Sequence, residues 1–210
     1  MSENARLIDP VKDKYDKSET YRKQLGRYKK AMNNEFYFEA LLIVYGMLED
    51  RLRSFLYYIG AMRREDSGKL DESKTRGILR CMYFGSTENA KNKNLDINNI
   101  SCKEKLIRKT LEWAIIQEGK PEEQYLALLK REYEGCLDIG GLLEILEGIE
   151  KWRGYRNEVI HGLLNKNVDS LNEELCKQVE MGMQYARFID SQVKALKKKD
   201  TIRIEMKIKR

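Results

Sequence analysis

The chain has 210 residues, of which 35% are charged and 41% hydrophobic, and its formal net charge is +6. This composition excludes a disordered chain and is typical of one large or two small globular domains with a sizeable core. No apolar run is long enough to span a membrane and the N-terminus lacks a signal core, so we expect a cytoplasmic protein without membrane contact. The basic surplus favours an anionic partner such as nucleic acid, although many basic proteins have none.

Cysteine and histidine usage limits the possible chemistry. Cys81, Cys102, Cys136 and Cys176 show no C-x-x-C spacing, and His161 is the only histidine. This pattern predicts neither a structural zinc site nor a disulfide framework. The sequence also lacks a glycine-rich phosphate loop, so we expect no metal and no cofactor.

The first two predicted elements are helices. Asp9 as N-cap and Pro10 in the first helical position predict a mostly polar helix over residues 9–34, lying on the surface. Residues 34–60 predict a long amphipathic helix that ends at Gly60. Its apolar positions recur at steps of three and four: Phe38, Leu41, Tyr45, Leu48, Leu52, Phe55 and Ile59.

Residues 61–100 are polar, Asn-rich and turn-rich, which predicts an irregular insertion with one short helix over 75–84. A helix follows over 101–119, with Ser101 as N-cap and Glu104 completing a capping box. The next helix is expected to begin at Pro121.

The last two long helices are predicted over residues 140–162 and 168–199. The second has an inner stripe of Leu175, Val179, Gly182, Ala186, Ile189, Val193 and Leu196. Residues 199–210 form a basic tail, either solvated or RNA-binding, in which Ile202, Ile204, Met206 and Ile208 alternate as in a strand. Because no second strand is predicted, this segment is expected to be an edge strand, an arm or disordered. We predict a single all-α domain over 1–210, an up-and-down helical bundle with a polar middle insertion.

The stretch "KWRGYRNEVIHGLLN", residues 151–165, carries the candidate site. On a helical wheel Arg153 and Arg156 lie within about 40° of the apolar side of this helix, and Asn157 lies near its edge. An unpaired charge buried on such a face is very costly, so either the face opens into a cleft or an acid meets it. Glu49, about 80° from the centre of the earlier apolar stripe, is the expected partner of Arg153 or Arg156.

Two further expectations concern side-chain directions. Asp50 is predicted to face solvent. His161 lies about 140° around a continuous helix from Arg156. Because Gly162 favours helix termination, the last turn is expected to loosen and let the His161 ring approach Arg156. The helix C-terminus would also favour the protonated imidazole.

These residues carry a family resemblance. R-N-x-x-x-H, formed by Arg156, Asn157 and His161 at a helix end, resembles the R-x(4–6)-H signature of the HEPN superfamily. The segment "EALLIVYGMLEDRL" resembles the acidic-residue helix of that family, and the resemblance covers roughly residues 34–60 and 140–198. It implies a bundle of HEPN type and a metal-independent endoribonuclease of the kind found in toxin–antitoxin, abortive-infection and CRISPR systems. Other HEPN domains are inactive binding modules.

The residue types fit this chemistry. Metal-free RNA cleavage needs a base for the 2′-OH proton, an acid for the 5′-oxygen and cations for the phosphorane charge. His161 can move protons near neutral pH, Arg156 can bind phosphate, and Asn157 can orient His161 or the phosphate, with Glu49 and Arg153 in supporting roles.

One histidine per chain suggests that two chains share a site, and the resemblance implies a homodimer with both motifs facing one cleft. RNA and an antitoxin or defence-system protein are the expected partners. In a subset of the family, a tyrosine two residues after the histidine is modified by a nucleotidyltransferase antitoxin. Leu163 stands at that position, which argues against this regulation. The alternative is a non-catalytic HEPN-like module that binds a protein or nucleotide, in which Arg156 and His161 are structural or hold the ligand.

Overall fold

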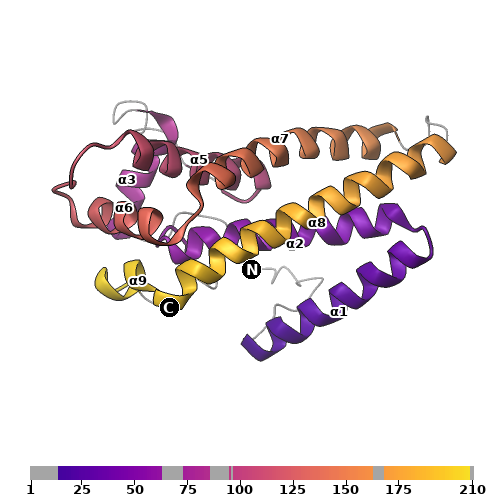
Figure 1. Cartoon of the computed structure of the whole chain (residues 1–210), viewed down its shortest axis with the longest axis horizontal. Helices are drawn as coiled ribbons and strands as arrows, with labels where there is room; N and C mark the ends of the chain where they lie inside the picture. Colours follow the sequence, from indigo (N-terminus) through magenta and orange to yellow (C-terminus); the bar gives the residue numbers. More distant parts are fainter. Residues whose placement is uncertain (1–13, 63–72, 86–94, 96, 163–167, 209–210) are drawn as a thin grey trace, which may run out of the picture.

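The computed structural model describes residues 14–62, 73–85, 95, 97–162 and 168–208, and all regular secondary structure within them is helical (Figure 1). The predicted all-α bundle is thereby confirmed. The described elements are α1 (Lys14–Asn33), α2 (Tyr37–Tyr58), α3 (Ser73–Phe84), α5 (Ile100–Ile116), α6 (Gln124–Cys136), α7 (Ile139–Gly162), α8 (Val168–Lys199) and α9 (Thr201–Glu205).

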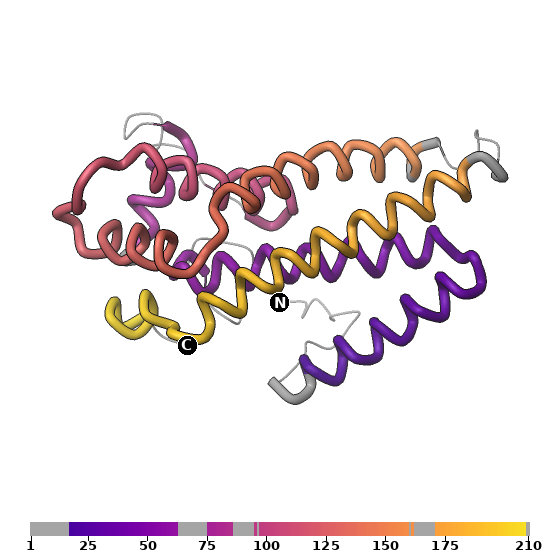
Figure 2. Tube along the Cα trace, in the orientation of Figure 1, coloured from indigo at the N-terminus to yellow at the C-terminus, as the bar shows by residue number. Residues whose placement is uncertain are grey.

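The centre of the bundle is the pair α2 and α8, which run in the same direction (Figure 2). Helix α1 precedes α2 and runs opposite to it, and α7 likewise runs opposite to α8 (Figure 2). The periodicity of both central helices is confirmed. All seven predicted positions of the α8 stripe are buried, and on α2 five of seven are buried while Phe38 and Tyr45 are partly buried.

Three helices meet closely at Gly182 of α8. A Cβ atom there would lie 2.5 Å from Cζ2 of Trp152 on α7 and 2.8 Å from Cγ1 of Val44 on α2. Real Cβ atoms do not approach neighbours this closely, because the overlap is strongly repulsive. The glycine in the middle of the α8 stripe therefore sets how near α7 and α2 come to α8.

The C-terminal end of α2 is closed by side chains from distant parts of the chain. Gly60 has a positive φ of 78°, a conformation that glycine adopts without strain. Its carbonyl accepts a hydrogen bond from Oγ1 of Thr75 at 2.8 Å, and the carbonyl of Ile59 accepts one from the hydroxyl of Tyr125 at 2.9 Å. Helix-terminal carbonyls lack partners within the helix, so these bonds anchor α3 and α6 at this end of the bundle.

The strand pattern near the C-terminus does not lead to a strand, an arm or disorder in residues 201–205, which form the short helix α9. Ile202 and Ile208 are buried, whereas Ile204 is 57% exposed. Arg203 is 2% exposed and donates hydrogen bonds to the carbonyls of Tyr57 at 3.0 Å and Met62 at 3.1 Å. The described part of the basic tail therefore packs against the end of α2.

Several helix boundaries differ from the predicted ones. Helix α5 is capped by Asn99, whose side chain accepts from the backbone N–H of Cys102, and not by Ser101. Helix α6 begins at Gln124, with Glu123 as N-cap, three residues after Pro121. The short helix predicted in the insertion exists as α3, whereas 9 and 10, expected to start the first helix, lie outside the described residues. Among the described helices, none combines the length and apolar character that a membrane crossing requires.

Candidate functional site

The C-terminal half of α7 presents the candidate motif on two different sides. Trp152 and Val159 are buried, and Arg156 is partly buried. Asn157 and His161 are exposed. The motif therefore lies at the border between the core and solvent, as expected for a helix with an arginine beside its apolar face.

Among the described residues, Arg156 is held by an aromatic ring and not by an acid. Its guanidinium carbon lies 4.2 Å above the centre of the Tyr45 ring on α2, which is a cation–π contact. One of its terminal nitrogens donates to Oδ1 of Asn157 at 2.9 Å. Its Nε is buried and has no hydrogen-bond partner among the described residues. The side chain therefore keeps unused hydrogen-bonding capacity beside an exposed amide.

The ring under Arg156 is itself fixed by α7. Tyr45 stacks on Trp152 with ring centres 6.3 Å apart and an interplanar angle of 22°. The indole N–H of Trp152 donates to the backbone carbonyl of Gln178 on α8 at 2.7 Å. An indole held at both its face and its N–H has little freedom. The stacked side chains of Trp152, Tyr45 and Arg156 therefore fix the place of Arg156 relative to α2 and α8.

Arg153 lies near a separate charged group. Glu104 of α5 is almost fully buried and accepts from Arg108 at 2.7 Å, while Arg108 also reaches Glu150 of α7 at 3.3 Å. Burial raises the pKa of Glu104, and the charges of Arg108 and Arg153 partly oppose this rise. Arg153 therefore opposes the effect of burial on Glu104, while its own buried Nε has no hydrogen-bond partner among the described residues.

The prediction that Glu49 pairs with Arg153 or Arg156 is wrong for the described side chains. Glu49 accepts from Nζ of Lys103 on α5 at 2.8 Å. The Lys103 side chain is only 4% exposed and also donates to the carbonyl of Asn98 at 2.7 Å. A buried ammonium requires such partners, so Glu49 serves to fix α5 against α2.

The prediction that Asp50 faces solvent is also wrong. Its carboxylate accepts from Lys17 at 2.7 Å, from the hydroxyl of Tyr21 at 2.8 Å and from Arg51 at 2.6 Å. Burial would raise the pKa of Asp50, but Lys17 and Arg51 outweigh it and lower that pKa. Arg51 also pairs with Asp190 of α8, so this polar cluster ties α1, α2 and α8 together.

His161 does not join the Arg156 group within one chain. Helix α7 remains regular through Gly162, so the expected loosening before His161 does not occur. The two side chains stay about 140° and roughly 7.5 Å apart along a regular helix. No hydrogen bond joins His161 to Arg156 or Asn157 in the described structure. A single α7 therefore presents the guanidinium and the imidazole as separate groups.

Two residues of this site were missed from the sequence. Tyr45 stands on the predicted apolar stripe of α2, and its place on that stripe could have suggested an aromatic platform for an arginine. Lys103 carried no such signal, because it is one of several lysines in an ordinary amphipathic helix. Tertiary packing alone makes it the partner of Glu49.

The described residues contain no group of three or more His, Cys, Asp or Glu side chains arranged to hold a metal ion. No family model matches the chain, and no curated protein or solved structure is significantly similar to it. The function must therefore be argued from the motif and its surroundings.

Proposed function

We propose that this protein is a metal-independent endoribonuclease of HEPN type that cleaves single-stranded RNA and acts in defence or as a toxin in the cytoplasm. The observation that carries the proposal is the R-N-x-x-x-H motif at the end of α7, with Arg156 oriented by Tyr45 and Asn157 and with His161 exposed. The all-helical bundle is compatible with the resemblance. An antitoxin or another defence-system protein would be its regulatory partner.

Each motif residue has a chemical role in this proposal. His161 takes the proton of the 2′-OH or gives one to the departing 5′-oxygen. Arg156 stabilises charge on the phosphorane, for which its terminal nitrogens are suited. Asn157 holds the guanidinium through the bond at 2.9 Å and offers its amide N–H₂ to the phosphate. The attacking 2′-oxygen displaces the 5′-oxygen, leaving a 2′,3′-cyclic phosphate and a 5′-hydroxyl.

A homodimer supplies what one chain lacks. The reaction needs two proton transfers, and each chain has one histidine, which a regular α7 keeps away from its own Arg156. Two copies that face each other across one cleft would provide two imidazoles and two guanidinium groups. We therefore expect a dimer in sedimentation. A stable monomer with full cleavage activity would contradict the composite site.

One observation favours a second candidate, a non-catalytic helical module that binds a protein or nucleotide. Arg156 packs on Tyr45 and its Nε is buried, which is how a purely structural arginine would also be held. In that case the motif stabilises the α2–α7 contact, and His161 contributes nothing to catalysis.

The test is cleavage of a single-stranded RNA in EDTA, followed by analysis of the product ends. His161→Ala should lower the cleavage rate by about 10²–10⁴-fold, and Arg156→Ala by a similar factor. A control variant, Lys177→Ala, removes an exposed cation that, within the described part of the chain, forms an ion pair with Glu173 of the same helix alone. It should leave the rate unchanged.

The substrate provides a second control. A single 2′-deoxy nucleotide at the preferred cut site should abolish cleavage there, because the nucleophile is gone. Cleavage that persists at that position, or activity that survives in His161→Ala, would refute the proposed chemistry. If Arg156→Ala only lowers the unfolding temperature and no RNA is cut by the wild type, the binding module is the better description.

A further inference from the structure

Helix α1 carries most of the net charge of the protein. The segment Lys14–Asn33 contains seven lysines and arginines and two carboxylates, so it accounts for five of the six net positive charges of the chain. The remainder of the chain nets one positive charge, because acidic connecting segments offset the basic surplus of the other helices. A charge imbalance that is largest on one helix indicates a specific electrostatic surface there.

The cations lie on the outward side of α1. Its inward positions, among them Tyr21, Leu25 and Tyr28, are partly buried. Apart from Lys17, which is bound to Asp50, five described cations of the helix are exposed: Arg22, Lys23, Arg27, Lys29 and Lys30. Glu19 pairs with the first two, at 2.7 and 3.7 Å.

Arg27, Lys29 and Lys30 form no ion pair among the described residues. The described side chains of α1 also include no exposed large hydrophobic group, so this face lacks what a membrane-inserting helix requires. Its chemistry suits an anionic polymer, along a helix of about 30 Å.

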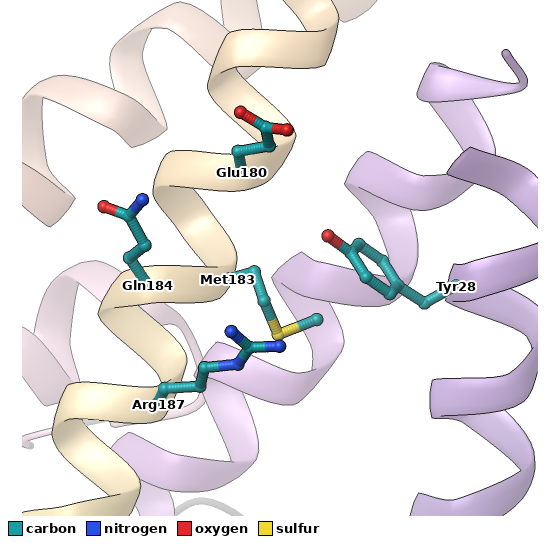
Figure 3. A pocket seen from close by; sticks show the side chains of 5 residues that line it. All are labelled: Tyr28, Glu180, Met183, Gln184 and Arg187. Carbon is teal, nitrogen blue, oxygen red and sulfur yellow. The ribbon is translucent and has the colours of Figure 1, made fainter. Parts of the chain in front are cut away.

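A pocket adjoins this face between α1 and α8. Its volume is about 330 Å³, and Figure 3 shows Tyr28 of α1 across from Met183 and Arg187 of α8. Glu180 and Gln184 of α8 complete the lining. This volume is at the small end of the range for ligand sites and suits one small aromatic group.

The pocket wall combines the groups that bind a nucleobase. The Tyr28 ring and the Arg187 guanidinium offer planar surfaces for stacking, and Met183 supplies an apolar floor. The Gln184 amide can donate to and accept from a base edge. Burial raises the pKa of Tyr28, so its phenol stays neutral beside such a base.

We propose that the outward face of α1 and the α1–α8 pocket together bind single-stranded nucleic acid. Arg27 and Lys30 contact the phosphates, and one base enters the pocket against Tyr28 and Arg187. This surface is separate from the α7 motif, and its binding does not depend on the proposed nuclease chemistry.

The test uses fluorescence anisotropy of a labelled single-stranded DNA 12-mer. DNA lacks the 2′-OH, so binding is measured without the proposed cleavage, and failure of one proposal is distinguishable from failure of the other. For single strands, the logarithm of the binding constant falls with the logarithm of the salt concentration by about 0.7 per phosphate contact. Each contact therefore contributes about fivefold to the affinity at 0.1 M salt. The double variant Arg27→Gln/Lys30→Gln should therefore bind about 25-fold more weakly, with a salt slope smaller by about 1.4.

The matched control removes two charges elsewhere. Lys197 and Lys198 are exposed cations near the end of α8, and Lys197→Gln/Lys198→Gln lowers the net charge by the same amount. This variant should bind within about twofold of the wild type, because loss of distant charge is screened beyond roughly 10 Å. Equal weakening by both double variants, or weakening by the α8 pair alone, would overturn the assignment to α1.

The pocket is tested separately by Tyr28→Leu. Removing the ring should weaken binding by about five- to a hundredfold, the range for loss of one stacked base, and leave the salt slope unchanged. If Tyr28→Leu binds the 12-mer as tightly as the wild type, no base occupies the pocket, and the proposed combined site is wrong.

Two further results would also refute the proposal. One is the absence of wild-type binding to the 12-mer at low salt. The other is binding only to vesicles containing phosphatidylserine, lost in Arg27→Gln/Lys30→Gln, which would assign the α1 face to a membrane surface.

Discussion

Helices α1 and α7 lie on opposite sides of the α2–α8 pair and are attached to it by different kinds of contact (Figure 1). On the α7 side, Trp152 fills the space above Gly182 and stacks on Tyr45. On the α1 side, Tyr21 and Lys17 bind the carboxylate of Asp50. One attachment depends on shape and apolar burial, and the other on charge and hydrogen bonds.

The difference has a physical consequence. Close apolar packing is insensitive to pH and salt and fails when volume is removed or added. A charged cluster loses its contribution when its carboxylate is protonated, and its exposed members are screened by salt. The motif helix α7 is therefore held rigidly, whereas the basic helix α1 is held by contacts that solution conditions can weaken.

The largest expected effect breaks the α7 attachment. Trp152→Ala removes a side chain that is 2% exposed, together with its bond to the carbonyl of Gln178. We expect the free energy of unfolding to fall by about 3–5 kcal/mol, measured by denaturant titration. A loss below about 1 kcal/mol would contradict the close packing of α7.

A smaller effect comes from adding volume at the same place. Gly182→Ala should destabilise the protein by about 1–3 kcal/mol, because the new methyl group meets Trp152 and Val44. The matched control is Gly46→Ala on α2, where a Cβ has no neighbour within 4 Å. That change should stabilise by about 0.5–1 kcal/mol, since alanine favours the helix. In thermal unfolding, Gly182→Ala should lower the midpoint temperature and Gly46→Ala should raise it. This pair of results would support close packing of α7 and α2 at Gly182.

The smallest effect concerns the α1 side and depends on pH. Asp50→Asn should lower stability by roughly 1–2 kcal/mol at pH 7, because charged hydrogen bonds to Lys17, Tyr21 and Arg51 are lost. The pKa of Asp50 lies below its ordinary value of 3.8 in the folded state. Its stabilisation is therefore complete above about pH 4 and is lost as the pH falls through the folded pKa.

The measurement compares wild type and variant by urea unfolding from pH 7 to pH 3, with amide exchange in α1 and α7. The difference in stability should shrink below pH 4, and exchange in the variant at pH 7 should rise in α1 more than in α7. Equal rises in both helices would mean that α1 and α7 unfold together, and the contrast between them would disappear.

Much of the fold was predictable because it depends on the local spacing of apolar residues along each helix. The stripe on α8 from Leu175 to Leu196 is visible in the sequence and is buried throughout. Apolar residues spaced at three and four positions must share one side of a helix, whatever the rest of the chain does. The same reasoning placed Arg156 beside an apolar face, which is where the structure has it.

The partners of the charged residues were not predictable in this way. A helical wheel places Glu49 and Arg156 on their own helices, but it contains neither the rotation of one helix against another nor their shift along the axis. These two quantities decide that Glu49 meets Lys103 and that Arg156 meets the Tyr45 ring.

The C-terminal segment shows the same division. Its alternating isoleucines satisfy a strand pattern, but a strand needs a neighbour for its backbone hydrogen bonds, and the described chain offers only helices. The buried carbonyls at the end of α2 offer acceptors instead, which Arg203 fills as part of α9. The sequence by itself determined which residues are apolar and with what spacing; the tertiary structure decided which backbone and side-chain groups they meet, because those partners lie as many as 146 positions away along the chain.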